Sequence, residues 1–189
     1  MNYLDTSIII ILLDESDYRF TTVKDVVVSG QTIISDLALV ELTSFLSRNN
    51  IENPLAFAVH IIKKYKINLL STISGSFIPG FGNINTLFYN TLNLSERLKL
   101  RTLDLIHVSY CIDLKDNDYE IDNLFTADKE FIKSKELLEE HKISLRIIQR
   151  RLRTLSATFQ ISLRLPLWEN LTVYTEKRSP LLWSGRARA

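Results

Sequence analysis

The chain has 189 residues, of which 46% are hydrophobic and 24% charged. This length suits one domain that buries a core without disulfides, and this composition excludes disordered and collagen-like proteins. The net charge of +1 hides an asymmetry, because residues 1–149 carry 15 Lys+Arg against 20 Asp+Glu, whereas residues 150–189 carry 8 against 2. We therefore expect one domain over residues 1–149 and a basic extension over residues 150–189, to which no catalytic role is assigned.

The chain has a single cysteine, Cys111, which excludes an intrachain disulfide and lies in an apolar run typical of a packed core. The apolar start of the chain has no basic residue before it and contains Asp5, so it does not resemble a signal peptide. No stretch reaches the roughly 18 apolar residues that span a bilayer. We therefore expect a cytoplasmic protein that does not contact membranes.

The first predicted element is a strand over residues 2–11 (NYLDTSIIII), because a continuous run rich in Ile is typical of a parallel strand buried on both faces. A second strand is predicted over residues 31–35 (QTIIS). Ser35 or Asp36 can then cap a helix that runs to Arg48. On this helix one face is shared by Leu37, Val40, Glu41, Ser44 and Phe45. Glu41 is therefore expected to point toward the apolar side.

The middle of the chain continues this pattern. An amphipathic helix is predicted after Asn53-Pro54, and a short strand in KINLLS, residues 66–71. The glycine-rich residues 74–85 are predicted to form a loop that could border a cleft, before a helix over residues 84–100. In that loop, Phe77 and Phe81 could pack locally or form a dimer or RNA surface.

The last third of the domain contains another helix and two strands. Thr102 can cap a helix with Asp104 in its first turn, followed by a polar loop over residues 113–123. The remaining elements are a strand in NLFTA, an amphipathic helix that begins at Asp128, and a strand in ISLRII. This alternation predicts an α/β fold with a doubly wound, mainly parallel sheet.

Four acidic side chains stand in runs that are too apolar for a solvated charge: Asp5, Glu41, Asp104 and Asp128. A buried carboxylate either shifts its pKa or finds a cation. Two of these acids fall near the ends of predicted strands, and the other two lie on helices that can flank the same crevice. We expect the four to converge on one cation site, although each alone could be a helix-end or solvent-facing acid.

These acids belong to four motifs whose order and spacing resemble the PIN-domain family, and most closely its VapC-like ribonuclease toxins. The motifs are D-T-S at Asp5, S-x-x-x-x-x-E ending at Glu41, R-x-L-D-x-I-H around Asp104, and T-A-D-x-x-F around Asp128. The resemblance covers about the first 148 residues. It implies a three-layer α/β/α PIN-like fold with a central, mainly parallel, twisted sheet.

The resemblance also implies site residues and a cofactor. The four acids would be the catalytic and metal-binding residues, with Mg²⁺ or Mn²⁺ as the ion, and Asp5 and Asp104 are our first choice as direct ligands. Asp128 would complete the site, and Glu41 would bind the metal or activate water. Such hard cations prefer oxygen ligands, orient a water for in-line attack and stabilise the leaving oxygen.

Supporting residues follow from the same motifs. Thr6 or Ser7 matches the hydroxyl position that assists the first aspartate, and Thr126 matches the one before the last. The additional acids between Asp104 and Asp128 depart from the family pattern, which leaves Asp122 as an alternative to Asp128.

The sequence leaves other interpretations open for His107 and Glu41. His107 lies one helical turn after Asp104, but a single histidine beside hard-oxygen ligands is more often a core or supporting residue, so it is not assigned as a ligand. Glu41 could instead pair with Arg48 or reach solvent.

The function implied by the resemblance is a metal-dependent endoribonuclease that hydrolyses RNA phosphodiester bonds, as the toxin component of a type II toxin–antitoxin system. A small antitoxin protein and a homodimer are implied in the same way. The alternative is a catalytically inactive PIN-like module that binds RNA or protein. A phosphoaspartyl phosphatase is disfavoured because the D-T-S motif lacks the second acid of a D-x-D pair.

Overall fold

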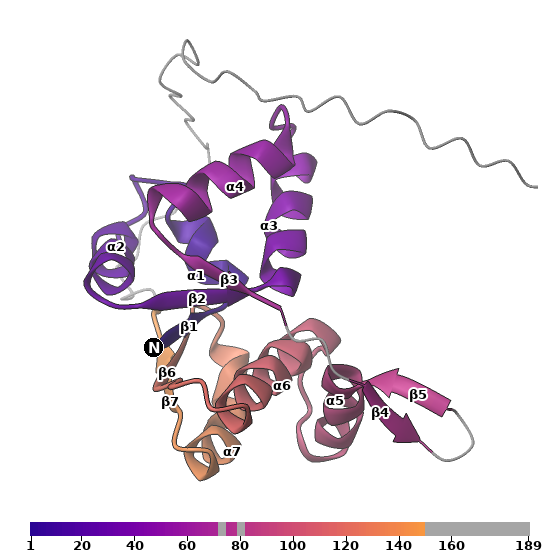
Figure 1. Ribbon diagram of the computed structural model, residues 1–189. Coiled ribbons are helices and arrows are strands. Elements are labelled where there is room, and N and C mark those ends of the chain that lie inside the picture. Colours follow the sequence, from indigo (N-terminus) through magenta and orange to yellow (C-terminus); the bar gives the residue numbers. More distant parts are fainter. Residues whose placement is uncertain (72–74, 79–81, 150–189) are drawn as a thin grey trace, which may run out of the picture. The chain divides into compact units, whose positions relative to one another are not determined.

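The computed structural model describes residues 1–71, 75–78 and 82–149 (Figure 1). The expectations for residues 150–189, for Phe81 and for the side chain of Phe77 fall outside what the structure describes. One sheet has the strand order β3-β2-β1-β6-β7, and all its pairings are parallel. Its strands are β1 (Asn2–Leu4), β2 (Thr32–Ser35), β3 (Asn68–Leu70), β6 (Asn123–Thr126) and β7 (Ser144–Ile147). The predicted doubly wound parallel sheet is confirmed.

Helices cover both faces of this sheet. They are α1 (Thr6–Ile11), α2 (Phe20–Ser29), α3 (Asp36–Arg48), α4 (Pro54–Lys64), α5 (Thr86–Arg97), α6 (Thr102–Asp116) and α7 (Lys135–Glu140), with a 3₁₀ helix η1 (Lys129–Ser134) before α7. None of the helices in the described part of the chain is both long enough and apolar enough to cross a membrane.

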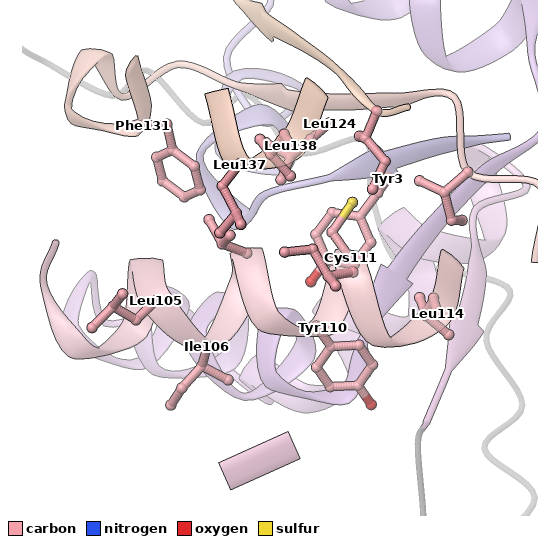
Figure 2. Packing of buried hydrophobic residues seen from close by; sticks show 14 of the residues in the cluster. Tyr3, Leu105, Ile106, Tyr110, Cys111, Leu114, Leu124, Phe131, Leu137 and Leu138 are labelled. Atoms are coloured by element: carbon pink, nitrogen blue, oxygen red, sulfur yellow. The ribbon is translucent and has the colours of Figure 1, made fainter. Parts of the chain in front are cut away.

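The core is divided by the sheet into two clusters, because neighbouring strand residues point to opposite faces. Leu4 and Ile34 pack with helices α1 to α4. Tyr3 and Ile33 pack on the other face with α5, α6, η1 and α7, in the cluster shown in Figure 2. The free thiol of Cys111 is buried in this second cluster, as predicted, and burial raises its pKa.

The prediction of a strand over residues 2–11 was wrong beyond Leu4. The chain turns at Asp5, and the isoleucine run forms α1, of which Ile8, Ile9 and Ile11 are buried. A continuous apolar run cannot distinguish a buried strand from a buried helix by its period. The early turn is important for the site, because it places Asp5 at the carboxyl end of β1 and at the N-cap of α1.

Helix α3 was predicted correctly, including its N-cap Ser35, whose hydroxyl accepts a bond from the Ala38 amide. Its buried face was not predicted correctly. The buried residues are Ala38, Leu42 and Leu46, whereas Val40 is 65% exposed. The apolar stripe is rotated from the expected one, so that Glu41 lies at its edge and not at its centre.

Three further predictions need correction. Residues 74–85 contain an antiparallel pair, β4 (Gly75–Ile78) with β5 (Gly82–Asn85), and not only a loop. The N-cap of α6 is Arg101, with Thr102 as the first helical residue, although Asp104 does lie in the first turn. Helix α6 continues to Asp116, through the first part of the predicted polar loop. Helix α2 had no counterpart in the sequence prediction.

Helix α6 buries an acid outside the four motifs, Asp113, which is 5% exposed. Its Oδ2 has no hydrogen-bond partner among the described residues, and burial, aided by the negative charge of Asp116, raises its pKa. A raised folded-state pKa contributes stability only while the carboxyl is protonated, and that contribution is lost as pH rises from the usual carboxyl range through the folded-state value.

We therefore expect Asp113→Asn to increase the free energy of unfolding at pH 7 by about 1 kcal/mol, because it removes a poorly solvated charge. Urea unfolding at pH 7 and at pH 4 measures this, and the gain should shrink at the lower pH. The exposed Asp25→Asn serves as control. A gain that is equal at both pH values would show that the charge of Asp113 is not responsible.

Candidate metal centre

The strand order reverses at β1, because the chain adds β2 and β3 on one side of it and β6 and β7 on the other. Crevices form beyond the carboxyl ends of strands at such a switch point. A cleft of about 210 Å³ is found there, and its lining residues are Asp5, Thr6, Ser7, Ile10, Glu41, Phe45, Arg48, Asp104 and Asp128. All four carboxylates of the predicted quartet thus line one cleft.

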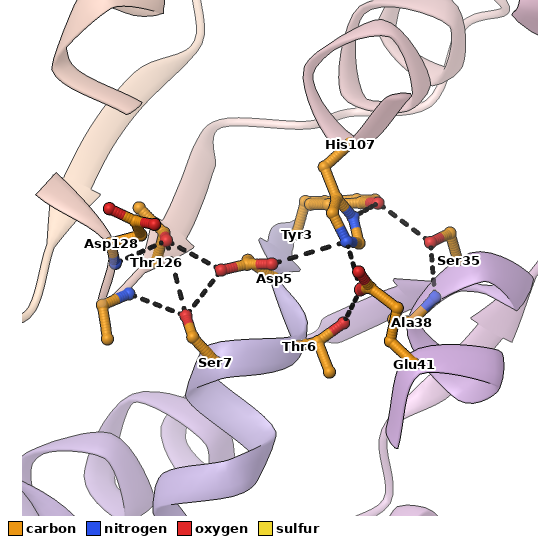
Figure 3. A network of polar contacts seen from close by, with 11 residues as sticks. Tyr3, Asp5, Thr6, Ser7, Ser35, Ala38, Glu41, His107, Thr126 and Asp128 are labelled. Carbon is orange, nitrogen blue, oxygen red and sulfur yellow. Dashed lines mark hydrogen bonds and ion pairs between the residues drawn. The ribbon is translucent and has the colours of Figure 1, made fainter. Parts of the chain in front are cut away.

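Local backbone geometry presents the first aspartate to this cleft. Asp5 occupies the N-cap of α1, but its carboxylate makes no capping bond. Its Oδ2 instead accepts hydrogen bonds from the hydroxyls of Ser7 at 2.5 Å and Thr126 at 2.8 Å (Figure 3). Asp5 is 6% exposed. These two donors orient Oδ2, while Oδ1 faces His107 on the opposite side.

The last aspartate follows β6. Asp128 is the N-cap of η1, where its Oδ1 accepts a bond from the Glu130 amide at 2.8 Å. Its own amide donates to the Thr126 hydroxyl at 3.0 Å. Thr126 therefore contacts both aspartates, and it fixes the end of β6 relative to the end of β1.

Glu41 reaches the cleft from α3 and forms the second half of the network. It accepts a hydrogen bond from the Thr6 hydroxyl, and its Oε2 lies 2.8 Å from His107 Nε2. Burial alone would raise the pKa of Glu41, but the bonds from His107 and Thr6 and the positive charge of His107 lower it below its ordinary value. The side chain is 21% exposed, so this carboxylate is ionised at the edge of the cleft.

His107 lies behind the cleft wall that Asp5 and Glu41 form, and its side chain is 1% exposed. Nε2 is 2.8 Å from Glu41 Oε2 and 3.4 Å from Asp5 Oδ1. Burial would lower the pKa of His107, yet the Glu41 bond and the charges of Asp5, Glu41 and Asp104 raise it. In the described part of the chain, His107 is the only basic side chain within 4.0 Å of the four carboxylates.

A chain of hydrogen bonds fixes the other ring nitrogen of His107. Its Nδ1 lies 2.9 Å from the Tyr3 hydroxyl. Tyr3 donates in turn to Ser35 Oγ at 3.0 Å, and Ser35 caps α3 through the Ala38 amide. The same cap that begins the Glu41 helix therefore also orients the histidine that contacts Glu41.

Asp104 is the one member of the quartet with an unsatisfied oxygen. Its Oδ2 is buried and has no hydrogen-bond partner within the described ranges. Burial, with the negative charges of Asp128 and Asp5, raises its pKa, and His107 and Arg101 only partly oppose this. A buried carboxylate oxygen without a donor is a costly feature that a bound cation would relieve.

The residues present fit a divalent cation. Carboxylate oxygens are the ligands that Mg²⁺ and Mn²⁺ prefer, and one carboxylate oxygen here is buried without a partner. Ligand atoms of Asp5, Glu41 and His107 lie within 4.8 Å of one another, which suits binding to one ion. Each of Thr6, Ser7 and Thr126 donates a hydrogen bond to one of these carboxylates.

The sequence left open Asp122 as an alternative to Asp128 and Arg48 as a partner of Glu41, and the structure shows where both side chains lie. Asp122 lies at the amino end of β6, is 65% exposed and pairs with the chain's terminal amine at 2.7 Å, so it lies at the opposite end of that strand from Asp128. Arg48 does not pair with Glu41. Its Nη1 donates to Ser44 Oγ at 2.7 Å, and the side chain lines the cleft.

Sequence reasoning missed Tyr3 and left His107 unassigned. The three-residue spacing from Asp104 placed His107 on the same side of α6, which is the signal that could have included it. For Tyr3, the signal was a hydroxyl inside an otherwise apolar strand, since a buried tyrosine hydroxyl usually has a partner.

Comparison with known proteins finds a likeness in structure and none in sequence. No family model matches the sequence, and no curated protein matches it either. Among solved structures, the chain is similar to VapC20 from Mycobacterium tuberculosis, which is described as a toxin that cleaves the sarcin-ricin loop. The TM-score is 0.51 at 17% sequence identity, and the match covers 70% of this chain and 93% of that chain. The chain therefore has a PIN-like α/β/α fold.

Proposed function

We propose that the protein is a metal-dependent endoribonuclease that hydrolyses RNA phosphodiester bonds, with Mg²⁺ or Mn²⁺ as cofactor. The observation that carries the proposal is the convergence of Asp5, Glu41, Asp104 and Asp128 on one cleft at the switch point of the sheet. The fold shared with VapC20, a toxin that cleaves the sarcin-ricin loop, supports RNA as the substrate. It also supports a role as the toxin of a toxin–antitoxin pair.

The same similarity supports three partner proposals: an RNA substrate, a small antitoxin protein and a second copy of this chain. The antitoxin would act by covering the acidic cleft, which would exclude both cation and RNA. A cytoplasmic location would suit such a toxin and its target.

The chemistry of the cleft follows from its charges. Four carboxylates outweigh the charges of His107 and of the lining residue Arg48 and repel a phosphodiester, so RNA would enter once a bound cation neutralises them. A bound divalent ion would supply that charge and lower the pKa of a bound water. Asp5 and Asp104 would hold the ion and Asp128 would complete the site. Glu41, kept ionised by His107 and Thr6, would bind the ion or orient the attacking water by accepting a hydrogen bond from it.

The proposal is tested by incubating the purified protein with a pool of structured and single-stranded RNAs in Mg²⁺, Mn²⁺ or EDTA. The matched control is the Asp5→Asn/Asp104→Asn double variant, with folding checked by circular dichroism. We expect cleavage that requires a metal and is lost in the variant. Equal cleavage by both proteins would indicate a contaminating nuclease and would leave the cleft without a role.

The second candidate function is a PIN-like binding module for RNA or protein. The observation in its favour is that Asp5, Asp128 and Glu41 all have hydrogen-bond partners within the protein, as structural acids would. A folded protein that binds RNA from the pool, yet cuts none of it with either metal, would support this candidate.

Arg48 is the cationic side chain in the cleft lining, and it lies two helical turns beyond Glu41 on α3. Seven helical residues span about 10 Å, so its guanidinium can contact an RNA phosphate beside the reacting one. We expect Arg48→Gln to raise KM for RNA several-fold and to leave metal binding unchanged. The slope of log affinity for RNA against log salt concentration should fall by about 1, the value for one lost phosphate contact.

The control for Arg48 is Arg97→Gln on α5, where the side chain is 58% exposed and pairs with Glu140 away from the cleft. Steady-state cleavage at two salt concentrations compares the variants. If both variants change KM and its salt dependence equally, the effect is one of total charge and not of the cleft.

A further inference from the structure

The donor atoms around His107 have the spacing of neighbouring ligands on one metal ion. His107 Nε2 lies 2.8 Å from Glu41 Oε2 and 3.4 Å from Asp5 Oδ1. In an octahedral site with bonds of about 2.1 Å, adjacent ligands are about 3.0 Å apart. The two measured separations lie on either side of that value, so one ion could contact all three atoms after small side-chain movements.

The hydrogen bonds behind His107 set its tautomer. Ser35 Oγ accepts from the Ala38 amide and from the Tyr3 hydroxyl. Because the Tyr3 proton is directed at Ser35, the Tyr3 oxygen is left as an acceptor for His107 Nδ1, 2.9 Å away. Nδ1 therefore carries a proton. Nε2 now bonds Glu41 Oε2, and it is the ring nitrogen whose proton a metal ion would replace. Histidines that bind metals are held in this way, with the second ring nitrogen donating to a fixed group.

We propose that His107 Nε2 is a direct ligand of the cation, beside Asp5 and Glu41, and that it makes the site prefer Mn²⁺ to Mg²⁺. The inference rests on the cation site of the proposed function and adds a nitrogen ligand to it. Imidazole nitrogen suits transition metals, whereas Mg²⁺ is bound almost entirely through oxygen. A purely carboxylate site would lack this source of preference. Tyr3 is then a positioning residue, which acts on the metal only through His107.

The direct test is pulsed electron paramagnetic resonance of Mn²⁺ bound to the intact wild-type protein, without RNA. A nitrogen ligand modulates the Mn²⁺ signal, and ¹⁵N-labelled histidine changes that modulation in a known way. The chain has three histidines, and His107 is the one that belongs, among the described residues, to the group of close ligand atoms with Asp5 and Glu41. We expect histidine modulation in the wild type, in His60→Gln and in His141→Gln, and its loss in His107→Gln.

Ion competition gives the second readout. We expect the ratio of Mn²⁺ to Mg²⁺ affinity, measured by calorimetry, to fall about tenfold or more in His107→Gln. Tyr3→Phe should reduce it less, because the ring nitrogen remains and only its partner is lost. Since the wild-type spectrum already tests the ligand, the proposal stays falsifiable even if His107→Gln does not fold.

The outcomes separate this inference from the proposed nuclease. Bound Mn²⁺ without histidine modulation would overturn the ligand assignment and leave the nuclease proposal standing. Histidine modulation in a protein that cuts no RNA would support the ligand and count against the nuclease. No Mn²⁺ binding at millimolar concentration would overturn both.

Discussion

Replacing Asp104 with asparagine is expected to eliminate metal-dependent cleavage and, at the same time, to stabilise the metal-free protein. The carboxylate Oδ2 is buried without a partner, and burial with the charges of Asp128 and Asp5 raises the Asp104 pKa. Removing that charge should increase the free energy of unfolding at pH 7 by up to about 1 kcal/mol. Removing a metal ligand should lower cleavage and metal affinity by about a hundredfold or more.

These two effects predict that the order of stability of Asp104→Asn and the wild type reverses when Mn²⁺ is added. In EDTA, Asp104→Asn should unfold at a higher urea concentration than the wild type. In Mn²⁺ at 100 times its dissociation constant, the wild type should gain about 2.7 kcal/mol and become the more stable protein. Asp122→Asn, at the far end of β6, is the control for activity and should retain cleavage. If Asp104→Asn is less stable in EDTA and binds Mn²⁺ normally, Asp104 has a structural role only.

The largest effect on stability is expected from Phe131→Ala. Phe131 has 0% exposure and packs in the α6 and α7 cluster, where Figure 2 places it near Leu137. Its segment begins at Asp128, so this ring also anchors the turn that presents Asp128 to the cleft. Truncating a buried phenylalanine costs about 3–5 kcal/mol, which is a large part of the 5–15 kcal/mol that stabilises a typical domain.

Urea unfolding measures this cost directly. The neighbouring Ile132 is 56% exposed on the same 3₁₀ segment, so Ile132→Ala should change stability by less than about 0.5 kcal/mol. Similar costs for the two variants would mean that η1 does not depend on the core contact of Phe131.

The parallel sheet and the crevice at the carboxyl ends of its strands were predictable because each rests on a strong local signal. Short apolar runs alternate with amphipathic helices, and this alternation specifies a parallel sheet. Carboxylates at the ends of two such runs must then lie at one edge of it. For the same reason Asp5 and Asp128 were expected to be neighbours, and the structure places both in the cleft lining.

The errors arose where one pattern has two structural solutions. The isoleucine run after Asp5 was predicted as strand and is helix α1, since both conformations bury such a run. The stripe of α3 was placed around Val40, which is exposed, because several helical rotations fit its many apolar residues. Only the tertiary contacts of α1 and α4 select the face that is buried.

The histidine network could not be predicted from local pattern. Tyr3 and His107 are 104 residues apart in the chain, and the bond between them depends on β1 and α6 packing against each other. No spacing rule encodes that contact. The sequence therefore indicated an oxygen-only site, whereas the structure adds an oriented imidazole beside two of the carboxylates.

The central claim is that these carboxylates hold a divalent cation in the cleft. The most direct test is anomalous diffraction from crystals of the protein grown with Mn²⁺. The account predicts an anomalous peak about 2.1–2.3 Å from oxygens of Asp5 and Asp104. A well-ordered cleft with no anomalous peak, or a peak bound only at the protein surface, would contradict it.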